Sequence, residues 1–256
     1  MRFKDKIVVI TGGGGGIGSA LCHGFAAEGV AVADVDLGAA QKVADEISRS
    51  GGRAKAWDFD VSDRLAVEKA ADEVETELGP LSLWINNAAI SHIVPFLGCS
   101  EDLWDLTLRI NLKGAFLGCQ AAIRRMLPRR QGVILNMSSQ SGKVGTSQYA
   151  AYCASKFGII GLTQSLAVEF AGEGIRLNAL CPGVVMTPLW DKMVGDYARK
   201  RKLKPEEVPR YLESKVPMGR LCTPEDVTRA AIFLASDEAT YITGQAINLS
   251  GGTVMY

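Results

Sequence analysis

The chain has 256 residues, of which 47% are apolar and 22% charged, and its formal net charge is zero. This balance gives no electrostatic basis for a nucleic-acid partner or an anionic membrane surface, and no apolar run approaches the ~20 residues of a membrane helix. Six cysteines without a CxxC pair and only two histidines argue against a metal site. Free thiols and the lack of a signal-peptide pattern lead us to expect a cytoplasmic protein.

Short apolar segments alternate with longer helical patterns along the whole chain. Strands are predicted near residues 6–11, 30–34, 53–58, 81–86, 132–137, 175–180 and 245–249. Helices are predicted near 17–28, 38–50, 64–78, 101–126, 150–171 and 224–235. Strands that are apolar throughout are buried on both faces, which indicates a parallel sheet. The pattern predicts one α/β domain over residues 1–256, a doubly wound parallel sheet of about seven strands with helices on both faces.

The segment 188–217 interrupts this alternation. It is charged and helical, and it follows the strand predicted at 175–180 without leading directly into another strand. A long insertion after the carboxyl end of a strand in an open α/β sheet lies over the ligand crevice. We therefore expect residues 188–217 to form a helical lid over the substrate.

A glycine-rich turn joins the first predicted strand to the first predicted helix. It reads TGGGGGIG, with glycines at 12–16 and 18. Glycines allow the backbone to pass close to a pyrophosphate, and the helix N-terminus offers free N–H groups to it. A turn in this context predicts a dinucleotide-binding site.

This turn and several later motifs resemble the short-chain dehydrogenase/reductase family, whose fold is Rossmann-like. Thr11-Gly12-x-x-x-Gly16-x-Gly18 matches its TGxxxGxG turn, and Tyr152-x-x-x-Lys156 matches its YxxxK motif. The other matches are Asp60-Val61, Asn86-Asn87-Ala88-Ala89 (NNAG in the family), Asn111, Ser139 and the Pro182-Gly183…Thr187 segment. The resemblance implies a nicotinamide cofactor held by Gly12, Gly16, Ile17, Gly18, Asp60, Val61, Asn87, Ala88, Tyr152, Lys156, Pro182, Gly183, Val185 and Thr187. It also implies a catalytic tetrad of Asn111, Ser139, Tyr152 and Lys156.

Two aspartates are candidates for the contact to the adenosine ribose. Asp34 and Asp36 follow the second predicted strand at the distance from the turn where such an acid is expected. We favour Asp34 over Asp36 and expect the other carboxylate to cap the next helix. Either one would repel a 2′-phosphate, and no Arg or Lys lies nearby to bind it, so the sequence favours NAD over NADP.

The predicted reaction is oxidation of a secondary alcohol, with Tyr152 as general base. A free tyrosine has a pKa near ~10, too high for this task at neutral pH. Lys156 lies one helical turn further on, and a cation ~4 Å away at an effective dielectric of ~20 is worth up to ~4 kcal/mol, about three pKa units. Ser139 would orient the substrate oxygen. Asn111, by the resemblance, would hold a water that relays the proton from Lys156.

The substrate follows less directly from the sequence. The lid and the C-terminal segment resemble those of sugar-alcohol dehydrogenases, and the predicted substrate contacts are Ser139, Gln140, Ser141, Gln148, Tyr152 and Trp190. Two glutamines suit the hydroxyls of a polyol. Arg199, Lys200 and Arg201 leave open an anionic substrate, although a solvated helix face is the commoner role of such a run.

There are two alternative functions. The chain could reduce a 3-oxoacyl thioester, or it could be an inactive protein of the same fold that senses NAD or acts as a scaffold.

The helices predicted at 101–126 and 150–171 carry apolar residues on more than one face. This is more than packing on a sheet requires, and family members pair through these helices. We therefore expect a homotetramer.

Overall fold

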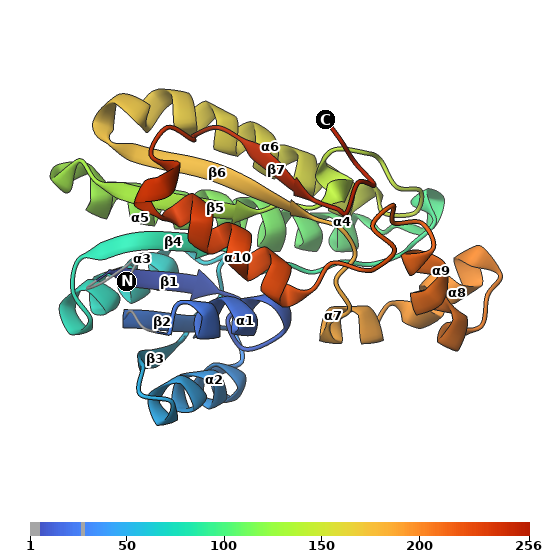
Figure 1. Cartoon of the computed structure of the whole chain (residues 1–256), viewed down its shortest axis with the longest axis horizontal. Coiled ribbons are helices and arrows are strands. Elements are labelled where there is room, and N and C mark those ends of the chain that lie inside the picture. The colour runs from blue at the N-terminus through green and yellow to red at the C-terminus, as the bar shows by residue number, and fades with distance from the viewer. Residues whose placement is uncertain (1–5, 27–28) are drawn as a thin grey trace.

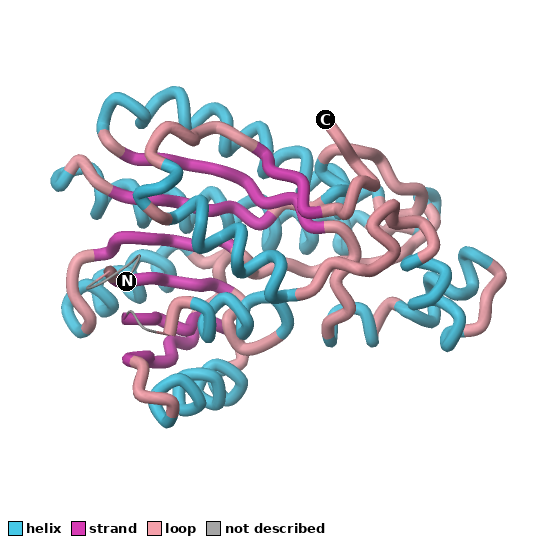
Figure 2. Tube along the Cα trace, in the orientation of Figure 1, coloured by secondary structure: helices cyan, strands magenta, loops and turns pink. Residues whose placement is uncertain are grey.

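The computed structural model describes residues 6–26 and 29–256. Seven parallel strands form one sheet in the order β3-β2-β1-β4-β5-β6-β7 (Figures 1 and 2). Their bounds are β1 Ile7–Thr11, β2 Gly29–Asp34, β3 Arg53–Asp58, β4 Leu81–Asn86, β5 Gly132–Met137, β6 Ile175–Pro182 and β7 Ala246–Leu249. Strands β1 to β3 are added toward one edge of the sheet and β4 to β7 toward the other, so the switch point lies at β1, between β2 and β4. The predicted fold class is confirmed.

Helices cover both faces of the sheet. On one face lie α1 (Gly16–Gly24), α2 (Leu37–Arg49) and α10 (Pro224–Ala235). On the other lie α3 (Arg64–Glu77), α5 (Gly114–Met126) and α6 (Ala150–Phe170). Alternate residues of β1 enter the two cores, because successive side chains of a strand point to opposite faces: Val8 and Ile10 pack with the first set, Ile7 and Val9 with the second.

Two predicted helices differ in detail. The helix predicted at 17–28 ends at Gly24, a poor helix former, and Phe25 caps it through its backbone N–H; residues 27–28 lie outside the described residues. The helix predicted at 101–126 is divided. α4 (Glu101–Leu108) and α5 are joined by a π-helical turn, Arg109–Lys113, that contains Asn111. π-Turns of this kind are frequent at functional sites.

The segment predicted to be a lid is helical. It contains α7 (Pro188–Asp191), α8 (Val194–Arg201) and α9 (Val208–Glu213), which lie beyond the carboxyl ends of the strands (Figure 1). These helices share a small apolar core with the start of α6, where Tyr197, Val208 and Leu212 pack with Tyr149 and Cys153. The segment is thus anchored to the helix that carries Tyr152 and Lys156. Within the described part of the chain, no helix is long and apolar enough to cross a membrane.

Candidate active site

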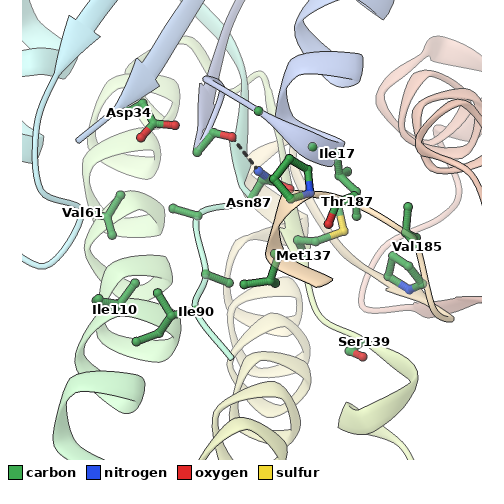
Figure 3. A pocket seen from close by; sticks show the side chains of 18 of the residues that line it. Ile17, Asp34, Val61, Asn87, Ile90, Ile110, Met137, Ser139, Val185 and Thr187 are labelled. Carbon is green, nitrogen blue, oxygen red and sulfur yellow. Dashed lines mark hydrogen bonds between the residues drawn. The ribbon is translucent and has the colours of Figure 1, made fainter. Parts of the chain in front are cut away.

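A cavity of about 450 Å³ opens at the carboxyl ends of the strands, at the switch point beside β1. Asp34 and Val61 lie toward one side of it and Ser139 toward the other, with Asn87 and Met137 between them (Figure 3). Its walls come from segments far apart in sequence: the glycine turn, the ends of β2 to β6, the start of α7, and α6. Residues for cofactor binding and for proton transfer therefore share one space.

The glycine turn fits a dinucleotide pyrophosphate. Gly12 and Gly16 have φ values of +66° and +54°, which disfavour any other residue. A Cβ added at Gly15 would meet no protein atom within 4 Å, so the backbone is open to the cavity there. Gly15 begins α1 without a side-chain cap, which leaves the first N–H groups of the helix without a capping side chain.

Gly18 has a different role from the one predicted. It does not line the cavity. A Cβ at Gly18 would lie 1.9 Å from the Gly12 carbonyl oxygen, which is impossible. Gly18 therefore allows α1 to pack against the turn, and its contact with the cofactor stays a prediction. Asn87 supports the turn from the other side, donating from Nδ2 to the carbonyls of Thr11 (3.0 Å) and Gly12 (3.2 Å).

The two candidate aspartates have separate places. Asp34 lines the cavity, and its Oδ2 and Oδ1 accept hydrogen bonds from the backbone N–H groups of Gly14 (2.9 Å) and Asp36 (3.1 Å). Asp36 does not line the cavity. It caps α2 by accepting from Ala39 N at 3.0 Å. Of the two carboxylates, that of Asp34 faces the cavity and that of Asp36 is engaged at the helix N-terminus, the arrangement favoured from the sequence.

The remaining predicted cofactor residues surround the same cavity. Its lining includes Gly12, Gly16, Ile17, Asp60, Val61, Asn87, Ala88, Pro182, Gly183, Val185 and Thr187. Ala89, which replaces the glycine of the family motif, also lines it. The carboxylate at one end of the cavity can accept hydrogen bonds from an adenosine ribose, and the uncapped helix N-terminus beside it can donate to a pyrophosphate. The residues therefore fit a nicotinamide dinucleotide.

Ser139, Tyr152 and Lys156 meet at the other end of the cavity. Ser139 follows β5, where its Oγ accepts from Ser141 N at 3.1 Å, and its side chain lowers the pKa of the Tyr152 hydroxyl. Lys156 lies one turn after Tyr152 on α6. It is almost fully buried and donates from Nζ to the Met137 carbonyl at 2.7 Å. The hydroxyls of Ser139 and Tyr152 and the ammonium of Lys156 therefore lie in the same part of the cavity.

Burial changes the pKa of both ionisable groups. It raises the pKa of Tyr152 to about 12, although the hydrogen bond from Ser139 opposes this rise. It lowers the pKa of Lys156 to about 8. In the protein alone, burial therefore outweighs the lowering of the tyrosine pKa that was predicted from Lys156. The Lys156 ammonium is directed to the Met137 carbonyl and lies 5.5 Å from the Tyr152 ring centroid, so desolvation of the phenolate dominates.

Asn111 lies behind this site rather than on its wall. Its side chain is buried, donates to the Ile90 carbonyl (2.9 Å) and to Ser155 Oγ (3.1 Å), and accepts from Ile90 N (2.8 Å). These bonds link the π-turn to the segment after β4 and to α6. Asn111 thus fixes the relative positions of two walls of the cavity.

Three predicted substrate residues do not line the cavity, whereas Trp190 does. Gln140 and Ser141 lie in the short 3-10 turn after Ser139, and Ser141 is buried there. Gln148 adopts a left-handed conformation (φ 65°), and its carbonyl accepts from Val94 N. Gln140 lies beside the cavity wall, since its Oε1 is 3.5 Å from the position of a Cβ at Gly183, which lines the cavity. Contacts of Gln140, Ser141 and Gln148 with the substrate stay predictions.

Several lining residues were not predicted. They are mainly apolar: Val35, Phe59, Ile90, Ile110, Met137, Pro188 and Leu189. Met137 is the last residue of β5 and Phe59 directly follows β3, positions that could have identified them. Ile90 and Ile110 carry no such sequence signal, since isoleucines of this kind are usual in any core.

Comparisons with known proteins agree with this architecture. A family profile described as "Enoyl-(Acyl carrier protein) reductase" matches residues 13–254. D-threitol dehydrogenase of Mycolicibacterium smegmatis is 38% identical, covering 98% of this chain and 94% of its own. Galactitol 2-dehydrogenase of Agrobacterium fabrum is 39% identical over 100% of both. The crystal structure of sorbitol-6-phosphate 2-dehydrogenase from Erwinia amylovora has a TM-score of 0.93 and 39% identity, covering 98% of this chain and 100% of that one.

Proposed function

The chain belongs to the short-chain dehydrogenase/reductase family, and from this premise we propose that it oxidises an uncharged polyol to the ketone with NAD. The observation that carries the proposal is the shared cavity, which joins the glycine turn and Asp34 to Ser139 and Tyr152. When bound, oxidised NAD would accept the hydride and bring a positive charge. The polyol assignment is supported by full-length similarity to threitol and galactitol dehydrogenases.

In this proposal each residue of the catalytic tetrad has a defined role. Ser139 binds the substrate oxygen, and Tyr152 removes the hydroxyl proton. Lys156 stabilises the tyrosinate and binds the nicotinamide ribose. Asn111 holds a water on the route from Lys156 to solvent. The buried surroundings strengthen each of these interactions, because water does not screen them.

An uncharged substrate is supported by the distribution of cations. Among the described residues that line the cavity, Lys156 is the one lysine or arginine, and Asp34 and Asp60 are the acids. Arg199, which could have met a substrate phosphate, forms an ion pair with Asp196 on its own helix. A phosphorylated polyol would therefore lose the solvation of its phosphate without gaining a fixed partner.

The substrate class is tested by steady-state kinetics with NAD. Free D-threitol, galactitol and sorbitol are compared with sorbitol 6-phosphate and with a 3-hydroxyacyl thioester. We expect kcat/KM for at least one free polyol to exceed that for the phosphate by about tenfold or more. The thioester represents the second candidate, a 3-oxoacyl thioester reductase, which Ile90, Ile110 and Leu189 on the cavity wall favour. A clear preference for the thioester would overturn the polyol assignment.

Asp34 is proposed to select NAD. Asp34→Ala should raise the dissociation constant of NAD by about tenfold, because a charge-assisted hydrogen bond to the ribose is lost. The same change should bring the affinities for NAD and NADP close together, since the repulsion of a 2′-phosphate is also removed. Titration of both dinucleotides by intrinsic fluorescence measures this.

Asp36→Ala is the matched control, and it should cost helix stability with little effect on either dinucleotide. Equal affinity of the unaltered protein for NAD and NADP would contradict the proposed selectivity.

We also propose that residues 188–217 form a substrate lid and that the chain assembles as a homotetramer. The lid is supported by the presence of Leu189 and Trp190 on the cavity wall. The assembly is supported by exposed apolar side chains on α5 and α6, namely Phe116, Phe157 and Val168. Light scattering at micromolar concentration should give the mass of four chains, and a monomer would contradict it.

A further inference from the structure

Three consecutive basic residues, Arg199, Lys200 and Arg201, end α8, and each has a different partner. Arg199 pairs with Asp196 within the same helix. The Arg201 guanidinium lies over the Tyr197 and Tyr211 rings, at 5.7 and 5.8 Å from their centroids, so it connects parts of the lid to one another. Lys200 differs from both, because it reaches out of the lid.

Lys200 contacts the turn that precedes the catalytic helix. Its Nζ donates to the Ser147 carbonyl and lies 4.9 Å from the centroid of the Tyr149 ring. The same ammonium lies 5.9 Å from the centroid of Tyr197 on its own helix. One partly buried cation therefore joins α8 to residues 147–149 through a carbonyl and two aromatic faces.

The turn that Lys200 binds is conformationally demanding and is close to the catalytic base. Gln148, next to the Ser147 carbonyl, has φ of 65°, which is uncommon for a residue other than glycine. The Tyr149 ring lies edge-on to the Tyr152 ring, with centroids 6.2 Å apart. The position of this turn therefore affects the place of Tyr152.

The lid side of the same contact leads to the substrate cavity. Tyr197 packs edge-on against Trp190, with ring centroids 5.5 Å apart, and Trp190 lines the cavity. A continuous series of contacts thus runs from the cavity wall through Trp190 and Tyr197 to Lys200, and from there to Tyr149 and the catalytic helix.

We propose that Lys200 is a positioning residue that holds the lid against the turn before the catalytic helix and so forms the substrate pocket. The inference rests on the proposed function for its kinetic consequence, although the structural coupling is independent of the substrate. Because Lys200 does not line the cavity, its effect on the reaction passes through Trp190 and Tyr149.

The test compares Lys200→Met, Lys200→Arg and Arg199→Ala with the unaltered protein. Methionine keeps length and apolar character but removes the charge, whereas arginine keeps a cation that can stack on tyrosine. Arg199→Ala is the matched control, since Arg199 is the preceding residue and its guanidinium pairs with Asp196 in the same helix. The shared apolar core of the lid should keep all variants folded, which their melting temperatures check.

Hydrogen exchange is the first measurement. In Lys200→Met, amides of residues 146–153 and 190–200 should exchange about tenfold faster, because both sides of the contact open more often. Lys200→Arg and Arg199→Ala should exchange within about twofold of the unaltered protein. Unchanged exchange in Lys200→Met would overturn the inference, even if no polyol were turned over and the proposed function failed.

Kinetics with the preferred polyol is the second measurement. In Lys200→Met, KM should rise about tenfold while kcat stays within about threefold and the dissociation constant of NADH is unchanged. Lys200→Arg should restore most of the KM. A loss confined to kcat, or an equal KM increase in Arg199→Ala, would contradict a role for Lys200 in forming the pocket.

Discussion

Replacement of Tyr152 by phenylalanine is expected to lower kcat by about a thousandfold, the usual contribution of a general base. The phenyl ring keeps the edge contact to Tyr149, so α6 should remain in place. Only the hydroxyl that faces Ser139 is lost. The affinity for NADH, measured by fluorescence titration, should therefore change by less than about twofold.

A Tyr152→Phe protein that kept a tenth or more of the original kcat would show that another group accepts the proton. Ser139→Ala is the companion variant. It removes the hydroxyl proposed to bind the substrate oxygen, so kcat should fall while Lys156 and the dinucleotide contacts stay intact.

Replacement of Lys156 by methionine is expected to damage both turnover and cofactor binding. Turnover should fall about a hundredfold, because the tyrosinate loses its nearest cation. The dissociation constant of NAD should rise about tenfold, because a charged hydrogen bond to the ribose is lost. Stopped-flow turnover and dinucleotide titration separate the two effects.

The Lys156→Met change should shift the pH dependence of kcat/KM in one direction. Oxidation requires unprotonated Tyr152, so kcat/KM rises with pH until the tyrosine has titrated. Burial raises the pKa of Tyr152 to about 12 in the protein alone. In the proposed mechanism the positive charge of Lys156 lowers it during turnover. Without Lys156, kcat/KM should still be climbing at a pH where that of the unaltered enzyme has levelled off. Identical profiles would mean that Lys156 does not act on the base.

The sequence predicted the sheet well because its strands carry a strong local signal. β1 is an almost continuous apolar run and β4 and β5 are predominantly apolar, which is typical of strands buried on both faces. The π-turn around Asn111 was not predictable. It depends on bonds to Ile90 and Ser155, which are remote in sequence.

The site was predictable where it depends on local motifs and not where it depends on tertiary packing. The glycine turn and the spacing of Tyr152 and Lys156 lie within single elements, so their arrangement follows from the sequence. The raised pKa of Tyr152 reflects burial by the whole fold. The left-handed conformation of Gln148 likewise has no local sequence signal.

The partners of the three basic residues at the end of α8 also could not be predicted from the sequence. From sequence, Arg199, Lys200 and Arg201 form a single cluster suited to an anion. In the structure each meets a different partner, an acid, a carbonyl with aromatic faces, and a pair of tyrosines. Which partner a long cation finds depends on neighbours that are not adjacent in sequence.

The most direct test of the central claim is an isotope experiment. The enzyme is given NAD and the preferred free polyol, deuterated at its carbinol carbons, and the reduced dinucleotide is analysed by mass spectrometry. We expect each reduced dinucleotide to carry a single deuterium, and we expect the Tyr152→Phe protein to form almost no reduced dinucleotide. Reduced dinucleotide without deuterium, or no reduction with any free polyol, would contradict the central claim.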